Sequence, residues 1–320
     1  MQQSGGNKVL GTLKRQGIVM ALVVIYILFA IASPQFRSLR NVILILRQVA
    51  TIGVMAAGMT FVIIGGNFDL SVGSLLSLCS VLCIGLHDRI GPVPAMLVAI
   101  IAGLASGAVS GFLVGYLKLN SMIVTLGMMN VIQALALMVT NGRSVYLEDT
   151  DVWFCQIGKG NIAGFPISAV IMILYIILMA VILMKRKYGH QILSTGGNAE
   201  ACRYSGIDDR RVLLKSFVLS GLSAAVGAIL LSSRGGSAQP TVGQSYEFDV
   251  ITAVILGGAS LAGGSGNIYK TFVGVLILGI LKNGFVMMGF PYYVQWIAQC
   301  LIMLVAVYLD MMSKKKKGAA

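Results

Sequence analysis

Apolar stretches, most of them about as long as a membrane crossing, follow one another along almost the whole chain. A helix of about 20 apolar residues spans the roughly 30 Å hydrocarbon core of a bilayer. Because lipid offers no hydrogen bonds to an open backbone, each such stretch is expected to be helical. The pattern therefore predicts an all-α, polytopic integral membrane protein with about ten transmembrane helices. The predicted spans are 18–32, 42–64, 70–87, 93–117, 121–140, 165–184, 212–233, 249–262, 271–288 and 292–312.

The composition excludes a soluble globular protein. Of the 320 residues, 57% are hydrophobic and 11% are charged, whereas soluble domains carry about 25% charged residues. No polar segment is long enough for a separate soluble domain, so residues 1–320 are expected to form a single transmembrane domain. The first span follows Lys8, Lys14 and Arg15 as in a signal peptide. We expect it to remain uncleaved, because multi-spanning proteins often keep their first helix.

The basic charge of the chain indicates membrane topology. The 24 Lys and Arg residues outnumber 11 Asp and Glu residues, which gives a net charge of +13. These cations separate apolar stretches and do not gather on one polar face, so we expect no nucleic acid partner. With the N-terminus in the cytoplasm, the cations on that side are Lys8, Lys14, Arg15, Lys118, Lys185, Arg186, Lys187, Arg203, Arg210, Arg211, Lys270 and the lysines at 314–317. The opposite side receives Arg37, Arg40, Arg89, Arg143, Lys159 and Arg234. This bias fits the positive-inside rule and predicts that both termini are cytoplasmic.

The weakest predicted span is 249–262, which is short and carries Gly257 and Gly258. A re-entrant segment is the alternative interpretation. Without this crossing, the lysines at 314–317 would lie on the outer side, against the positive-inside rule. We therefore expect 249–262 to cross the membrane.

A polar, glycine-rich segment separates the second and third spans. Gly65, Gly66, Asn67, Asp69 and Ser71 interrupt the apolar sequence there. Glycines allow backbones to approach closely, and polar side chains satisfy amides where a helix breaks. One interpretation is that Asn67 and Asp69 cap the next helix. The other is that this segment forms part of the wall of a solute pathway.

A similar pattern recurs about 190 residues later, where Gly257 and Gly258 follow an apolar run and precede a second glycine group. Corresponding glycine-interrupted spans in two halves of a chain point to a transport pathway. Asn130 and Asn283 add polar side chains at membrane depth. They are candidates for contacts with a solute, and the alternative is hydrogen bonding between helices.

Catalytic residues are not expected. The two histidines, His87 and His190, are far apart in the sequence, and the glycine-rich run at 263–271 lacks the glycine before lysine that a P-loop needs. Cys79 and Cys83 are one helical turn apart but have no histidine or second cysteine pair nearby, so no metal site is expected. We expect no cofactor on this chain, and any ATP hydrolysis would belong to a partner subunit.

The polar loop at about 185–211 is the densest basic segment. Asn198 is suited to cap a short helix with Glu200 and Ala201 in its first turn, and Gly206 is suited to end it. A short exposed helix between two spans has the form of an element that docks into a groove of a soluble partner. The alternative is an ordinary loop in which Arg210 and its neighbours only set the topology.

The residues at 194–212, followed by 217–222, closely resemble the coupling segment of sugar-importing ABC transporter permeases of the ribose type. Further stretches resemble that family in the same order: 65–74, 123–127, 236–243 with Tyr246 and Glu247, and 254–266. The resemblance covers nearly the whole chain, so the protein is identified as a member of this permease family. One departure is Asn67-Phe68, which stands where the family usually has a single residue before the Asp.

The resemblance implies a permease that forms a homodimer in membrane lipid and provides the translocation path. It implies two partners: a cassette ATPase subunit beneath the permease and an extracytoplasmic sugar-binding protein above it. The implied location is the bacterial cell membrane. Carried over by position, the residues that couple to the ATPase would be Asn198, Glu200, Ala201, Gly206, Ile207 and Arg210.

The expected function is import of a monosaccharide, with a ribose-like pentose as the first candidate. Few ionisable groups lie within the spans, which suits a neutral solute. Another small solute, such as a nucleoside, inositol or an autoinducer-type sugar, is the alternative within the same family. A branched-chain amino acid would need more polar anchors for its charged ends. A passive channel is the alternative outside it.

Overall fold

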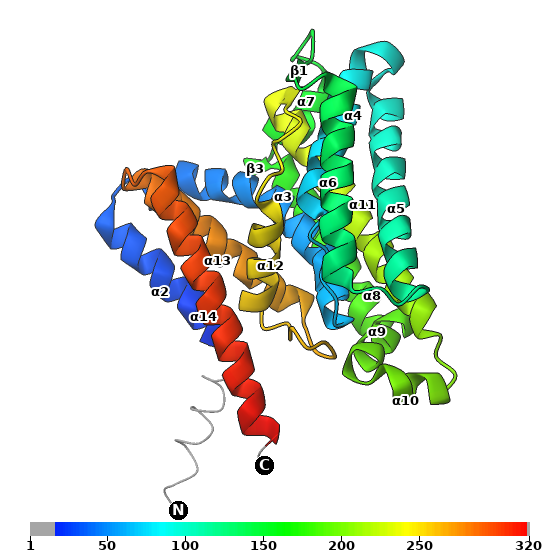
Figure 1. Ribbon diagram of the computed structural model, residues 1–320. Helices are drawn as coiled ribbons and strands as arrows, with labels where there is room; N and C mark the ends of the chain where they lie inside the picture. The colour runs from blue at the N-terminus through cyan, green and yellow to red at the C-terminus, as the bar shows by residue number, and fades with distance from the viewer. Residues whose placement is uncertain (1–16, 319–320) are drawn as a thin grey trace, which may run out of the picture.

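The computed structural model describes residues 17–318, and Figure 1 shows an almost entirely helical chain. The helices that overlap the predicted spans are α2 (Gly17–Ala32), α3 (Leu39–Ile64), α4 (Val72–Ile90), α5 (Pro92–Gly115), α6 (Ser121–Thr140), α8 (Ile167–Lys185), α11 (Asp209–Gly235), α12 (Tyr246–Leu256), α13 (Ile268–Met287) and α14 (Tyr292–Gly318). The connecting helices are α7 (Trp153–Lys159), α9 (Lys187–Gly197) and α10 (Ala199–Tyr204). Lys8, Lys14 and Arg15 lie outside the described residues.

The strands are short and belong to the connections. They are β1 (Val145–Tyr146), β2 (Asn161–Ile162), β3 (Phe165–Pro166) and β4 (Ser237–Ala238). Antiparallel pairing joins β1 to β4 and β2 to β3. The first pair ties the loop after α6 to the loop after α11, at the upper end of the molecule in Figure 1.

Polar residues in the loops decide where several of the apolar helices begin. The side chain of Ser38 accepts a hydrogen bond from the amide of Asn41 at the start of α3. Asn120 and Asn267 cap α6 and α13 in the same way. Each cap satisfies an amide that a helix start leaves free, which is costly to bury in an apolar environment.

The polytopic helical class is confirmed. Within residues 17–318, the helices long and apolar enough to cross a membrane number seven: α3, α4, α5, α6, α8, α11 and α13. The apolar helices Gly17–Ala32 and Tyr292–Tyr308 are shorter. These nine segments correspond to nine of the ten predicted spans, and the tenth differs.

The segment predicted to cross at 249–262 is not a continuous helix. The helix there, α12, contains 11 residues and ends at Leu256, so it is about 16 Å long at 1.5 Å per residue. Gly257 and Gly258 follow it, and Gly258 has a φ of +78°. In Figure 1 the chain descends from β4 through a non-helical segment into α12, and α13 then runs back up. This part of the chain is therefore irregular backbone followed by a short helix, and a crossing here stays a prediction.

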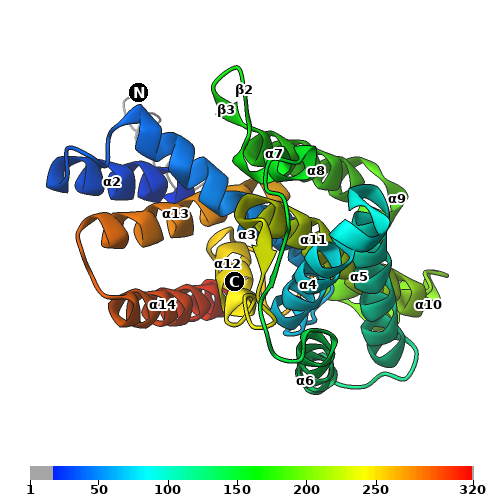
Figure 2. The ribbon, with the colours of Figure 1, turned by 90° about the horizontal axis from the view of Figure 1, so that it is seen from above.

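Helices α3 and α11 form the centre of the molecule, and their neighbours bury them (Figure 2). Helices α4, α5 and α8 contact this centre, as do α12 and α13. Helix α6 and helix α14 lie on the periphery with many exposed apolar side chains. The lower ends of α2 and α14 lie at the same end of the molecule as α9 and α10 (Figure 1).

A seam of small residues brings α5 against α11. Gly103, Gly107, Gly111 and Gly115 recur every four residues along α5 and face α11. A Cβ at Gly103 would lie 2.6 Å from the carbonyl oxygen of Gly221, and a Cβ at Gly115 would lie 2.7 Å from that of Arg210. Small residues are what allow helix backbones to approach this closely inside a bilayer.

This seam predicts a selective cost for one added methyl group. In Gly107→Ala the new Cβ meets the carbonyl oxygen of Phe217 and lies 2.9 Å from the Cα of Val218, so the two backbones must separate. Overpacking of this kind costs about 1–3 kcal/mol. We expect the thermal unfolding midpoint in detergent to fall.

Gly127→Ala in α6 is the matched control, because a Cβ there meets nothing within 4 Å. The expected effect is neutral or stabilising by up to about 1 kcal/mol, the gain in helix propensity. Equal midpoints for the two variants would contradict close packing between α5 and α11.

Candidate functional site

The segment between α8 and α11 contains the short helix expected from the sequence. The side chain of Asn198 accepts a hydrogen bond from the amide of Ala201 at 2.9 Å, and Glu200 lies in the first turn, where a negative charge is favourable. Gly206 follows the helix with a φ of +76°, and the amide of Ile207 donates to the carbonyl of Cys202 at 2.9 Å. These bonds define both ends of α10. Helix α9, which precedes it, was not predicted.

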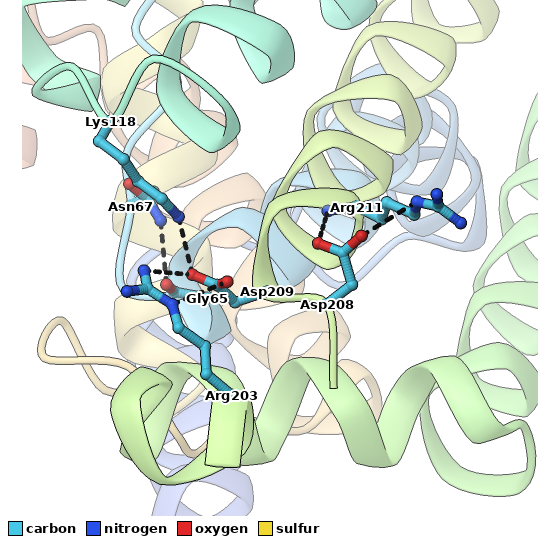
Figure 3. A network of polar contacts seen from close by, with 7 residues as sticks. All are labelled: Gly65, Asn67, Lys118, Arg203, Asp208, Asp209 and Arg211. Carbon is cyan, nitrogen blue, oxygen red and sulfur yellow. Dashed lines mark hydrogen bonds and ion pairs between the residues drawn. The ribbon is translucent and has the colours of Figure 1, made fainter. Parts of the chain in front are cut away.

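One buried carboxylate anchors α10 (Figure 3). The guanidinium of Arg203 donates two hydrogen bonds to Asp209, at 3.0 and 2.8 Å. The ammonium of Lys118 donates a third, at 2.7 Å. The bonds with Asp209 raise the pKa of the Arg203 guanidinium above its ordinary value. Since Lys118 belongs to the turn between α5 and α6, Asp209 joins α10, α11 and that turn at one point.

The neighbouring carboxylate has a different role. Asp208 caps α11 by accepting a hydrogen bond from the amide of Arg211, and it forms an exposed ion pair with the Arg211 side chain at 3.0 Å. Asp208 therefore caps α11, whereas Asp209 holds α10.

The side of α10 away from the protein is exposed. Glu200, Ala201, Gly206 and Arg210 are exposed, and Ile207 is half-buried. Tyr204 is 86% exposed at the tip of the helix. The structure thus gathers the predicted coupling residues on one projection that carries a large aromatic side chain.

Below the helices, α9 meets the two glycine-rich breaks. The amide of Gly264 donates to the carbonyl of Ile64 at 2.8 Å. A Cβ at Gly196 would clash with the carbonyl of Ile64 and lie 2.6 Å from the amide of Gly264. A Cβ at Gly263 would lie 2.9 Å from the amide of Gly66. We call these three contacting segments, 64–66, 196–197 and 263–264, the glycine junction.

The polar residues after Gly66 are engaged within the protein. Both carboxylate oxygens of Asp69 are used: one accepts from the hydroxyl and amide of Ser71, at 2.6 and 3.1 Å, and the other from the hydroxyl of Ser220, at 2.8 Å. The amide group of Asn67 donates to the carbonyl of Gly65 at 2.9 Å. This arrangement favours local packing: Asp69 joins the start of α4 to α11.

The remaining predicted pathway residues do not gather at one place. Gly257 ends α12 against the backbone of Thr271 in α13, and Gly258 is beside it. Asn130 is exposed on α6 and donates within its own helix. Asn283 is buried and accepts a hydrogen bond from Asn41 at 2.9 Å, which is an interhelical bond between α13 and α3.

Sequence reasoning missed a polar cavity of about 320 Å³ among α3, α11, α12 and α13. Its wall contains an ion pair between Lys282, whose side chain is partly exposed, and the buried Asp249. The sequence offered one sign of this ion pair: Lys282 is the one lysine within the predicted span 271–288, and Asp249 is the one aspartate of the preceding short span. The lining residues are Leu44, Gln48, Val49, Ile52, Arg234, Tyr246, Asp249, Gly279, Lys282, Asn283, Val286 and Met287.

Within residues 17–318, seven helices of membrane-spanning length, joined by short connecting helices, indicate a multi-pass membrane protein. Among the residues described, no group of three or more His, Cys, Asp or Glu side chains is arranged to hold a metal ion.

Comparisons with known proteins agree with this class. A family model described as the permease component of branched-chain amino acid transport systems matches residues 41–307. The chain is 39% identical over 310 residues to the ribose import permease protein of Bacillus subtilis strain 168, covering 97% of this chain and 95% of that protein. No solved structure matches it.

Two proteins of Escherichia coli strain K12 are also similar. Its ribose import permease protein is 37% identical over 304 residues, covering 93% of this chain and 94% of that protein. Its L-arabinose transport system permease protein is 34% identical over 309 residues, covering 94% and 92%. The chain belongs to this family of ABC transporter permeases, and the resemblance seen in its sequence is confirmed.

The anchor of α10 predicts a local effect. Asp209→Ala removes the carboxylate shared by Arg203 and Lys118, so α10 loses its attachment to α11. We expect amide hydrogen exchange over 199–207 to accelerate by about tenfold or more, equivalent to about 1.4 kcal/mol of local opening.

Arg211→Ala is the control for this experiment. It removes an ion pair whose two side chains are exposed, worth about 0–1 kcal/mol, and it leaves the cap of α11 in place. Unchanged exchange in Asp209→Ala would show that these ion pairs do not hold α10.

Proposed function

We propose that the chain is the transmembrane permease subunit of an ABC importer for a monosaccharide, with ribose as the first candidate substrate. Similarity to two ribose import permeases along more than nine-tenths of the chain supports the substrate class. The observation that carries the coupling role is the exposed helix α10, which Asp209 holds through Arg203. The chain itself is not an enzyme in this proposal.

The ATPase partner would dock on α10. Tyr204 supplies an exposed aromatic side chain and Arg210 a nearby exposed cation, both suited to a groove on a soluble subunit. Closure of ATP-bound cassettes would then push on α9 and α10, and the glycine junction would pass that displacement to the breaks after α3 and α12. Backbone contacts without intervening side chains transmit such a displacement directly.

A second copy of the chain would complete the pathway. Helices α6 and α14 present many exposed apolar side chains on one side of the molecule, with α12 between them in Figure 2. Lipid contact alone would suit such faces, but the broken segment beside α12 needs a covered environment. A homodimer through this side would enclose the path between two copies of α12.

The end that bears α9 and α10 would be cytoplasmic, since Lys118, Lys185, Arg186 and Lys187 lie there, as the positive-inside rule requires. Both termini would be on that side of the bacterial cell membrane. The sugar-binding protein would dock at the opposite end, which is formed by β1, α7 and the β2–β3 hairpin.

The cycle follows from linkage. ATP-bound cassettes must stabilise the outward-facing state and hydrolysis must favour the inward-facing one, because a ligand that binds two states equally shifts neither. The permease supplies the element with two states, and the sugar is released when the path opens to the cytoplasm.

Reconstitution tests the function. Proteoliposomes that contain the permease, its ATPase and its binding protein should import ribose only when ATP is present on the side where the ATPase lies. The permease alone should show no ATPase activity. A panel of pentoses, hexoses, inositol and a nucleoside identifies the substrate. Flux without ATP would contradict the proposal and indicate a passive channel.

The docking role of α10 predicts a selective loss of ATPase binding. Tyr204→Ala removes a side chain that is 86% exposed, so stability should change little. Removal of an aromatic anchor from an interface costs about 2 kcal/mol or more, so co-purification of the ATPase should fall by about tenfold or more. Tyr146→Ala, which is exposed at the opposite end, should leave co-purification unchanged. Equal co-purification for both variants would exclude Tyr204 from the interface.

A further inference from the structure

The cavity is lined by charged side chains of segments predicted to lie within the membrane, where a charge costs free energy. Asp249 is in the first turn of α12, and Lys282 is in the second half of α13, in the middle of a predicted crossing. Ionisable side chains inside a membrane are rare, and they mark solute or ion pathways when they border a cavity. Packing of α12 on α13 by itself would be served by apolar side chains such as those around the pair.

The pair leaves hydrogen-bonding capacity unused. Asp249 is 4% exposed, and its Oδ2 accepts the hydrogen bond from Lys282. Its Oδ1 is buried and has no hydrogen-bond partner among the described residues. The ammonium of Lys282 has three donors, and the ion pair uses one of them. A buried acceptor without a partner costs free energy, so the pair is suited to a ligand that supplies a donor.

The cavity wall adds further polar groups beside this pair. Gln48, an exposed residue of α3, and Arg234, an exposed residue at the end of α11, belong to the lining. The rest of the lining is apolar, with Val49, Ile52 and Val286 among its members. Few convergent polar groups in an otherwise apolar cavity are typical of small-molecule sites, and a volume of about 320 Å³ falls within their usual range of about 300–1,000 Å³.

We propose that this cavity is a membrane-embedded binding site for an uncharged polyhydroxylated solute. One hydroxyl donates to Oδ1 of Asp249, and the adjacent hydroxyl accepts from the ammonium of Lys282. A hydroxyl group both donates and accepts, so a pair of neighbouring hydroxyls matches a free acceptor beside free donors. Asp249 and Lys282 balance each other's charge, and the third charged residue of the wall, Arg234, is exposed. The pair itself therefore requires no charge on the solute. The inference rests on the proposed function and names the residues that contact its substrate.

The structural alternative is that the pair only fastens α12 to α13. Such a role predicts that breaking the pair slows transport of every sugar equally. Contact with a hydroxyl predicts selectivity: the uptake rate of a sugar that lacks this hydroxyl should not fall when the pair is broken. Deoxy analogues of the transported sugar therefore distinguish the two roles.

The experiment uses the reconstituted complex with saturating binding protein, and it compares maximal uptake of the parent sugar with uptake of its monodeoxy analogues. Because the same binding protein serves every permease variant, its own preference cancels when variants are compared. In the wild type, at least one monodeoxy analogue should be taken up about tenfold more slowly than the parent, as expected for a lost hydrogen bond to a charged group.

In Asp249→Asn and in Lys282→Met, uptake of the parent sugar should fall to the rate of that analogue, whose own uptake should change less than about threefold. Gln48→Ala removes an exposed side chain from the wall and should show the same selectivity with a smaller, about threefold, effect. It tests the site even where the ion-pair variants do not assemble. Ser106→Ala, which removes a polar group in α5 outside the cavity, is the matched control and should leave all rates unchanged.

An equal fall for parent and analogues in all three cavity variants would overturn the inference, and so would wild-type rates in all three. In both cases monosaccharide import by the wild type would still support the proposed function. Absence of monosaccharide import by the wild-type complex would overturn the proposed function itself.

Discussion

The structure depends on the requirement that backbone amides and carbonyls inside a bilayer find partners within the protein. A continuous helix satisfies this requirement with its own hydrogen bonds, whereas a broken helix must be covered by other protein segments. Here the breaks after α3 and α12 cover each other: the amide of Gly264 donates to the carbonyl of Ile64. Glycine at 196, 263 and 264 is what allows three backbones to meet there without side chains between them. The three segments of the glycine junction therefore pack together because their backbone groups need hydrogen-bond partners.

The same requirement explains why the exposed helix α10 is tied to the interior. Its anchor, Asp209, is the first residue of α11, where that helix begins after the polar segment that contains α9 and α10. A carboxylate buried there needs partners, and Arg203 and Lys118 supply them from two different connections. In the proposed coupling, displacement of α10 acts on α11 through these bonds, while α9 acts on the glycine junction.

The sequence predicted those features that depend on neighbouring residues. Hydropathy predicted 121–140 where α6 runs over Ser121–Thr140, because a membrane helix that is little buried within its own chain must be apolar along its whole length. The helix at α10 was predictable because Asn198 and Gly206 define its ends locally. Hydropathy failed for 249–262, since the apolar residues of α12 are buried by protein and carry no information about crossing length. It also failed for α9, whose mixed polarity resembles a loop.

The proposed pathway residues were harder to predict because their roles depend on distant partners. Asp69 is apparent as a functional candidate in sequence, but the hydroxyl of Ser220, 151 residues away, satisfies it. Asp249 and Lys282 are 33 residues apart, and only the antiparallel packing of α12 on α13 brings them together. A short helix is what makes this pair accessible: α12 begins at Tyr246, below the end of α11, so its first turn borders a cavity. A continuous helix would fill that space with another turn. Irregular backbone before Tyr246 is costly inside a bilayer. It is also the feature that leaves room for a polar solute beside the charges of Asp249 and Lys282.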